Sequence, residues 1–212
     1  MLKPFAFVIH LQRSVDRLFG IEKRIPRNLI EWEFFDAIAC PGKNARGCFL
    51  SHLGVIREAQ RRKLSRVIIF EDDVVVKPDF IIPDDLPAPI IAMGVNCGDF
   101  LQWIPGENGF WKVASFFAST AGMIIHESIY ESLLSFGEKI LLEIDNPEVD
   151  VDLYSQFASH GLCNVMVPIP FLIEVMETKS TIASEKDPTN DRDFMRTAEE
   201  ALALRYLEMI TL

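Results

Sequence analysis

The feature that most constrains this sequence is a short apolar run that ends directly in three consecutive acids. The run is Val67-Ile68-Ile69-Phe70, the acids are Glu71-Asp72-Asp73, and Pro78 closes the segment. Four apolar residues, three of them β-branched, predict a strand that is buried on both faces. In an open α/β sheet, ligands bind beyond the carboxyl ends of the strands. The acids are therefore predicted to lie at a ligand site.

The acid cluster favours a bound divalent cation. Side chains alternate in an extended segment, so Glu71 and Asp73 are predicted to share one face while Asp72 points the other way. Two carboxylates on one side of a strand end repel each other unless a positive charge lies between them. Mn²⁺ and Mg²⁺ prefer oxygen ligands and are the natural candidates. The alternative is an acidic turn that is simply solvated.

The segments before this strand complete a βαβ unit. Residues 5–11 predict a first buried strand, and residues 32–38 predict a second short strand. Residues 47–60 have apolar positions at helical spacing and predict a helix led by a glycine. Its first turn would carry Ser51 and His52 beside exposed backbone N–H groups, which form a ready anion site. The alternative for His52 is an ordinary packed histidine.

Two arginines follow the first strand. Arg13 and Arg17 are placed where they could hold a phosphate bidentately, or they could belong to a solvated helix face.

A later helix, predicted from residue 147, carries Asp150 and Asp152 in an acid-rich first turn that also suits the helix dipole. These positions leave catalytic and structural roles open.

The remaining segments alternate between short strands and helices without an internal repeat or linker. Prolines interrupt the predicted strand at residues 165–173, which indicates an edge strand. The other predicted elements are strands near 89–95, 100–103, 110–113 and 119–125, a helix at 126–142, and an amphipathic helix at 198–212. This pattern predicts one α/β domain over residues 1–212.

Charge and composition exclude several classes. The formal net charge of -10 argues against a nucleic-acid partner. The four cysteines show neither a CxxC pair nor zinc-type spacing, which favours free thiols in a reducing compartment. No stretch reaches the ~18 apolar residues of a membrane span, and the first residues lack a signal-peptide pattern. A cytoplasmic location is the resulting expectation.

Several segments, in order, carry a family resemblance. The specific part is Gly47-Cys48-Phe49-Leu50-Ser51-His52, followed by the strand that ends in Glu-Asp-Asp. The accompanying segments are Val8-Ile9-His10-Leu11 with Arg13 and Asp16-Arg17, then Phe35-Asp36-Ala37, and Val149-Asp150 with His160 downstream. Together they resemble glycosyltransferase family 25, which contains bacterial lipooligosaccharide β-galactosyltransferases and collagen galactosyltransferases. The resemblance covers roughly residues 5–182 and leaves 183–212 outside.

The resemblance implies a fold and a reaction. It implies a GT-A-type Rossmann-like mixed sheet flanked by helices, and an inverting transfer of a hexose, usually galactose, from a UDP-sugar. The acceptor would be a hydroxyl of a glycan or lipooligosaccharide-type molecule. Peripheral association of the protein with a membrane is a further expectation. A Mn²⁺ or Mg²⁺ ion would neutralise the leaving diphosphate.

The resemblance also implies site residues. Asp73 would hold the metal, assisted by Glu71 or Asp72. His160 would be a further metal or phosphate ligand, or else an ordinary histidine at a helix end. Asp150, with Asp152 next, would be the base that inversion requires. The implied donor-binding residues are Arg13, Arg17, Asp36, Ser51 and His52.

The chain departs from the family at two places. His10 stands where the family usually has asparagine, and Ala45-Arg46 stands where it often has glycine-glutamate. These departures keep a non-catalytic sugar-nucleotide binder as an alternative. A metal-dependent nucleotidyltransferase or phosphohydrolase is the other alternative, although the glycine-rich or lysine-bearing phosphate loop usual for that class is not found.

Overall fold

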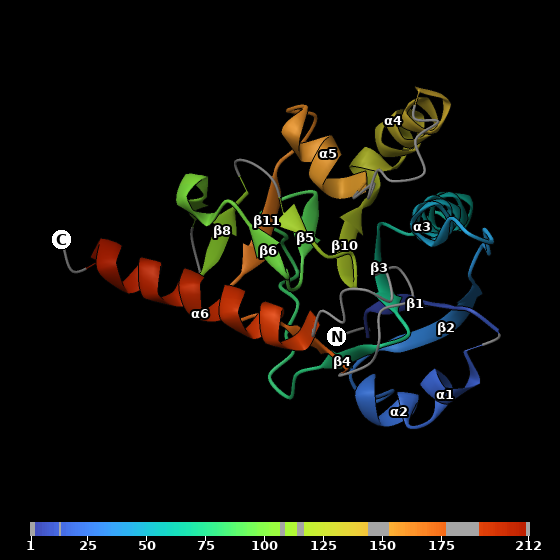
Figure 1. Cartoon of the computed structure of the whole chain (residues 1–212), viewed down its shortest axis with the longest axis horizontal. Helices are drawn as coiled ribbons and strands as arrows, with labels where there is room; N and C mark the ends of the chain where they lie inside the picture. Colours follow the sequence, from blue (N-terminus) through green and yellow to red (C-terminus); the bar gives the residue numbers. More distant parts are fainter. Residues whose placement is uncertain are drawn as a thin grey trace.

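A mixed eight-stranded sheet forms the centre of the protein (Figure 1). The structure, a computed structural model, describes residues 3–12, 14–106, 109–113, 117–143, 153–176 and 191–210. The strand order is β2-β1-β3-β10-β5-β11-β8-β7. The strands are β1 Phe5–His10, β2 Glu31–Asp36, β3 Arg66–Glu71, β5 Ile90–Ala92, β7 Ile104–Pro105, β8 Phe110–Lys112, β10 Gly122–His126 and β11 Val165–Pro168.

Helices cover both faces of this sheet. In Figure 1, α3, α4 and α5 lie on one side, and α1, α2 and α6 lie on the other. The helices are α1 Val15–Leu18, α2 Ile21–Arg24, α3 Asn44–Arg61, α4 Tyr130–Glu143, α5 Leu153–Ser159 and α6 Asp191–Ile210, with short 3-10 turns η1 Phe100–Gln102 and η2 Glu127–Ile129. The Rossmann-like mixed sheet flanked by helices that the sequence predicts is therefore confirmed.

Strand β3 lies where two halves of the sheet meet. It pairs in parallel with β1, which pairs in parallel with β2, and it pairs antiparallel with β10 on its other side. Because β10 runs the opposite way, the start of β10 lies beside the end of β3, with Gly122 opposite Phe70. Residues just before β10 are thereby brought to the carboxyl end of β3.

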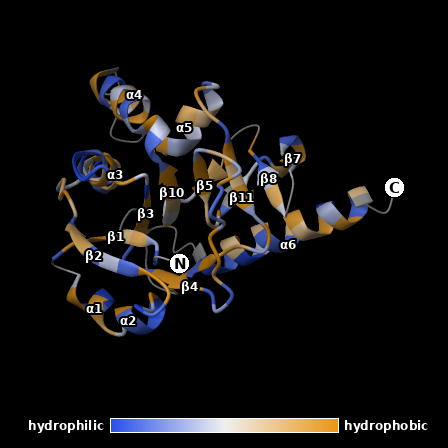
Figure 2. Cartoon of the chain, turned by 180° about the vertical axis from the view of Figure 1, so that it is seen from behind, coloured by the Kyte–Doolittle hydropathy of each residue, from blue (hydrophilic) through white to orange (hydrophobic). Residues whose placement is uncertain are grey.

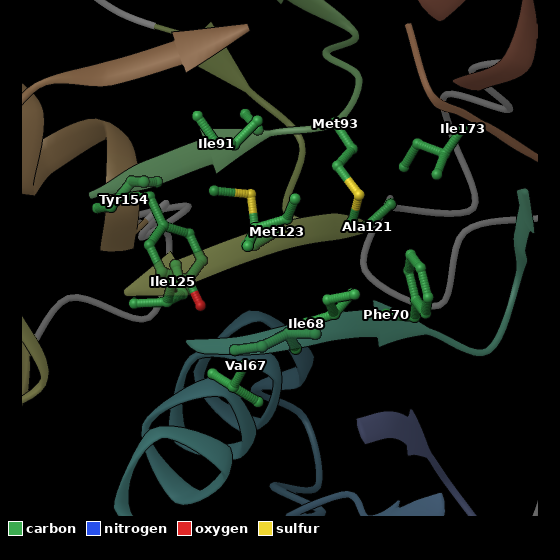
Figure 3. Close-up of a cluster of buried hydrophobic side chains, with 14 of the residues drawn as sticks. Val67, Ile68, Phe70, Ile91, Met93, Ala121, Met123, Ile125, Tyr154 and Ile173 are labelled. Carbon is green, nitrogen blue, oxygen red and sulfur yellow. The ribbon is translucent and has the colours of Figure 1, made fainter. Parts of the chain in front are cut away.

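The core explains why β3 is so apolar. Val67, Ile68, Ile69 and Phe70 are at most 1% exposed, as the predicted doubly covered strand requires. Figure 3 shows side chains of β3, β10 and β5 gathered in one cluster, with Tyr154 of α5 at its margin. In Figure 2 the central strands are mostly in hydrophobic colours, whereas much of α2 and α3 is hydrophilic. The acids after Phe70 thus interrupt a buried apolar segment that resumes with Val74 and Val76.

Two small sheets flank the main one. β4 Val74–Val76 pairs antiparallel with β12 Ile173–Val175, and β6 Cys97–Gly98 pairs antiparallel with β9 Phe117–Ala118. The first pair begins directly after the acids, so the chain turns at Asp72 and Asp73 and continues as a strand. Because Asp72 in this turn is only 5% exposed, the alternative of a simply solvated acidic turn is wrong.

Three sequence predictions about elements are corrected. β11 is an internal strand between β5 and β8, not an edge. Its proline is tolerated because only Val165 and Met166 pair with β5, whereas Pro168 is the last residue of the strand. The final helix begins at Asp191 instead of residue 198, and residues 100–102 form a 3-10 turn instead of a strand.

Within the described ranges, no helix has the length and apolar character needed to cross a membrane.

Candidate active site

A cleft opens at the carboxyl ends of the three parallel strands β2, β1 and β3, where ligands bind in open α/β sheets. Glu71 and Asp72 form one wall, at the end of β3. The other lining residues are Ile9 and Leu11 at the end of β1, Ser14 and Arg17 near α1, residues 37–40 after β2, and Asn44, Gly47, Cys48 and Ser51 of α3. The predicted position at a strand-end cleft is therefore confirmed for Glu71 and Asp72, whereas Asp73 is not among the lining residues.

The Asp72 carboxylate is held by the side chains of two residues from the first part of the chain, His10 and Arg17. Its Oδ2 lies 2.7 Å from His10 Nδ1, and its Oδ1 accepts a 2.7 Å hydrogen bond from Arg17. Arg24 donates to the backbone carbonyl of Asp72 at 2.8 Å. Asp72 is 5% exposed. A buried carboxylate requires such partners because desolvation penalises its charge.

Asp73 is the least compensated acid of the three. Arg17 reaches its Oδ2 at 3.2 Å, but Oδ1 is buried and has no hydrogen-bond partner among the described residues. Burial, the negative charge of Glu71 and that of Asp72 outweigh Arg17 and raise the pKa of Asp73 to about 7. A cation at this oxygen would relieve an unfavourable buried charge, so Asp73 fits a metal ligand.

The predicted orientation of the three acids is partly wrong. Asp72 does not point away from its neighbours, because it lines the cleft together with Glu71 and shares Arg17 with Asp73. The period-2 alternation fails because β3 ends at Glu71, and Asp72 and Asp73 form a turn. All three carboxylates consequently contribute to one negative region.

Glu71 faces α3 and the start of β10. Its Oε1 accepts a 2.6 Å hydrogen bond from Thr120 Oγ1, and the Cys48 thiol lies 3.7 Å away. His52 Nε2 lies 3.7 Å from the same oxygen. Burial raises the pKa of Glu71, but His52, Thr120 and Cys48 outweigh it and hold the pKa below its ordinary value. Glu71 is therefore stabilised as a carboxylate.

The start of α3 forms the opposite wall of the cleft. Ser51 Oγ donates to the Gly47 carbonyl at 2.7 Å and accepts a 2.8 Å hydrogen bond from the Ile38 backbone N–H. The helix begins at Asn44, so Ser51 and His52 lie beyond its first turn. The predicted anion site made by these two side chains at the helix N-terminus is thus wrong. Ser51 instead fixes the loop after β2 against α3.

We expect Gly47→Ala to destabilise this wall. An added Cβ would lie 2.5 Å from the Ile38 carbonyl oxygen and 3.3 Å from the Cys40 backbone nitrogen, so the backbone itself would have to move. Overpacking of this kind costs about 1–3 kcal/mol, measurable by urea unfolding. Gly137→Ala is the matched control, because its close contacts are with flexible Leu53 methyl groups. Equal losses for both variants would contradict the role of Gly47.

Arg17→Met should cost about 3–5 kcal/mol of unfolding free energy, because it leaves buried carboxylates without their shared cation. Arg17 is 8% exposed. Burial lowers the pKa of its guanidinium group, but Asp73 and Asp72 outweigh that effect, so the pKa lies above its ordinary value. The control is Arg57→Met, whose partner Glu138 is exposed, and it should cost less than about 1 kcal/mol. Similar losses in denaturant titrations would refute this assignment.

Other predicted site residues lie elsewhere or outside the described residues. Asp36, the last residue of β2, is exposed and is paired in register with His10. His160 follows α5, packs against Phe136 and has its Nδ1 2.8 Å from the Gln156 carbonyl oxygen. Arg13, Asp150 and Asp152 lie outside the described residues.

Sequence reasoning missed several residues that contact the acids or His52. The ones in question are His10 and Arg24 beside Asp72, Thr120 and Cys48 beside Glu71, and Tyr154, whose hydroxyl lies 2.8 Å from His52 Nδ1. The spacing of Cys48 and His52, four residues apart on one helix, was an available signal. Thr120 and Tyr154 carry no local signal, because tertiary packing alone brings them to Glu71 and His52.

The fold and the cleft define an α/β protein with an acid-lined site at the ends of parallel strands. Residues 42–83 match the family described as glycosyltransferase family 25 (LPS biosynthesis protein). The matched segment includes the start of α3 and all three acids, so the resemblance seen in the sequence is confirmed there. The match supports a glycosyltransferase. A comparison with curated proteins gave no match.

A comparison with solved structures found similar chains at low sequence identity. A glycosyltransferase involved in glycosylation of the major capsid of PBCV-1 has 11% identity and a TM-score of 0.43, covering 79% of this chain and 93% of that chain. A nucleoside-diphosphate-sugar pyrophosphorylase from Vibrio cholerae RC9 has 16% identity and a TM-score of 0.43, covering 92% and 81%. The glycosyltransferase GlyE of Streptococcus pneumoniae TIGR4 has 10% identity and a TM-score of 0.44, covering 74% and 43%.

Proposed function

We propose that this protein is an inverting, metal-dependent glycosyltransferase of family 25. The proposed donor is a UDP-hexose, with galactose as the sugar, and the proposed acceptor is a hydroxyl of a glycan or lipooligosaccharide-type molecule. The observation that carries the proposal is the position of Glu71 and Asp72 on a cleft at the ends of β2, β1 and β3. That position coincides with the segment that matches the family.

Asp73 and Glu71 are the residues proposed to hold Mn²⁺ or Mg²⁺. Both offer carboxylate oxygens, which hard cations prefer. The fit rests on Oδ1 of Asp73, which is buried without a hydrogen-bond partner among the described residues, and on the burial and the repulsion by Glu71 and Asp72 that raise the pKa of Asp73. When bound, such an ion neutralises the charge that develops on the leaving diphosphate.

Asp72 has a different proposed role. Its carboxylate already has Arg17 and His10 as partners at 2.7 Å, so it positions the turn and does not complete the metal shell. The same reasoning moves Arg17 from a direct phosphate contact to a residue that fixes both Asp72 and Asp73. Ser51 likewise keeps the cleft wall in place through its two backbone hydrogen bonds.

The remaining roles are proposed for residues named by the family resemblance. Asp150 is proposed as the base that takes the proton of the acceptor hydroxyl, since inversion needs a base opposite the leaving group. Arg13 is proposed to contact the diphosphate, and Asp36 the nucleoside, from the end of β2. His160 is proposed as a phosphate contact. Asp152 is the second candidate for the base.

Thermal shift and product analysis test the proposal. The protein is incubated with Mn²⁺ and UDP, GDP or CDP, with EDTA as the control, and Tm is recorded. We expect a rise in Tm for UDP that depends on Mn²⁺. UDP-galactose is then supplied with lipooligosaccharide-type acceptors, and the products are separated. UDP release with a galactosylated acceptor supports the proposal. Release of UMP or phosphate without UDP identifies a nucleotidyltransferase or phosphohydrolase instead.

A further inference from the structure

A second group of potential metal ligands lies on the α3 side of Glu71. Cys48 and His52 are four residues apart on α3, so both side chains lie on the same face of the helix. That face meets the end of β3, where Glu71 ends the strand. Cys48 Sγ, His52 nitrogen and a Glu71 oxygen all lie within 4.8 Å of one another. No role in the proposed transfer requires a thiol at this position.

The spacing of these atoms is close to that of a coordination shell. Glu71 Oε1 lies 3.7 Å from His52 Nε2 and 3.7 Å from Cys48 Sγ. Tetrahedral Zn²⁺ with metal–ligand distances of 2.0–2.3 Å places its ligand atoms about 3.3–3.6 Å apart. Two of the three separations are thus within a few tenths of an ångström of those in a coordination shell, and the third, between the Cys48 and His52 ligand atoms, is at most 4.8 Å.

His52 provides an independent indication. Its side chain is 1% exposed, and its Nε2 is buried without a hydrogen-bond partner among the described residues. Buried polar atoms are normally hydrogen-bonded, so a ring nitrogen that faces a carboxylate at 3.7 Å without a hydrogen bond needs an explanation. When Nδ1 carries the ring proton, it donates to the Tyr154 hydroxyl at 2.8 Å, and Nε2 presents its lone pair toward Glu71.

The surroundings support a coordinating histidine. Metal-bound histidines usually have their other ring nitrogen held by a hydrogen bond, which fixes the ring and its tautomer. Tyr154 supplies that bond, and its ring meets the His52 ring edge to face at 5.5 Å between centroids. Figure 3 shows the Tyr154 side chain at the margin of the apolar core. Thr120 orients Glu71 through the 2.6 Å hydrogen bond.

The site is also accessible. Cys48 and Glu71 line the cleft, whereas His52 closes the inner end of the cluster. An ion could therefore enter from the cleft and keep one coordination position directed toward it. Three protein ligands with an open position are typical of reactive rather than purely structural zinc sites.

We propose that Cys48, His52 and Glu71 form a binding site for a zinc-class transition-metal ion. The sulfur and nitrogen donors favour Zn²⁺ or Co²⁺ over Mg²⁺ and Mn²⁺. The site is thus distinct in chemistry from the oxygen site proposed at Asp73, although Glu71 borders both. Binding converts the Cys48 thiol to a thiolate and releases its proton to solvent. The inference does not depend on glycosyl transfer.

Cobalt absorption tests the site without any nucleotide. Co²⁺ is titrated into the metal-free, reduced protein, and the near-ultraviolet thiolate-to-cobalt band is followed. We expect a saturable band at one equivalent that Zn²⁺ abolishes by displacement. The band should be lost in Cys48→Ser and in His52→Gln, with circular dichroism used to verify that each variant is folded.

Two matched cysteine variants serve as controls. Cys40→Ser alters another thiol on the same cleft, and Cys163→Ser alters a thiol whose pKa burial raises to about 12, which makes it a poor ligand. Both should keep the band. A wild-type protein without a band, a band that survives in Cys48→Ser, or one lost in either control would overturn the proposal. UDP binding with Mn²⁺, measured on the same preparations, tests the proposed function separately.

Discussion

Asp73→Asn should abolish Mn²⁺-dependent UDP binding and reduce sugar transfer by about 100-fold or more. The amide keeps the shape of the side chain but removes the charge that attracts a hard cation to the end of β3. Calorimetric titration of UDP in the presence of Mn²⁺ and initial rates of transfer measure the two effects. Asp79→Asn, which alters an exposed acid six positions later, is the control and should behave as the wild type. Near-normal transfer by Asp73→Asn would contradict the assignment.

The same variant gives a stability readout that does not involve nucleotide. The folded state raises the pKa of Asp73 to about 7 because of burial and the charges of Glu71 and Asp72. The stability contributed by the protonated form is therefore complete below the ordinary pKa of 3.8 and is lost as pH rises through about 7. In EDTA, Asp73→Asn should match the wild type near pH 4 and have the higher Tm near pH 8. A variant with the lower Tm at pH 8 would show that the charge of Asp73 is well compensated.

Asp150→Asn should leave UDP binding intact and lower kcat by about 10²–10⁴-fold. A general base contributes this much when it accepts the proton of the attacking hydroxyl, and an amide cannot accept it. Transfer rates at saturating donor measure the loss, and Mn²⁺-dependent UDP titration measures the binding. Asp152→Asn is the paired variant, with a smaller expected loss. A larger loss in Asp152→Asn would transfer the role to that residue, and unchanged turnover in both would place the base elsewhere in the chain.

Much of the fold around β3 and α3 could be predicted from local patterns. The apolar run before Glu71 predicted a doubly buried strand, and the spacing of apolar residues predicted the packed face of α3. The predicted start of α3 was wrong because the sequence lacks a helix-capping signal at the true start. Helix α3 begins at Asn44 without a side-chain cap. The helix start was instead assigned to Gly47, whose small size is required by its contact with the Ile38 carbonyl.

The arrangement of the acids depended on partners that are distant in sequence. Alternation along an extended segment is a reliable rule only while the strand continues, and it gave the wrong orientation for Asp72 because a turn follows Glu71. The hydrogen bonds from His10 and Arg17 then decide where that carboxylate points. Neither partner could be inferred from periodicity, since each is more than 50 positions away from Asp72.

Because β3 and β10 pair antiparallel, a short fragment that contains the acids would lack some of the residues that contact them. The family segment at residues 42–83 contains the acids, but Arg17 precedes it and Thr120 follows it. A fragment cut to that segment, or the same segment transplanted into another scaffold, would carry three neighbouring acids without Arg17 and Thr120, which contact them in the assembled sheet. The acid turn is therefore a product of the whole assembled sheet and not a portable module.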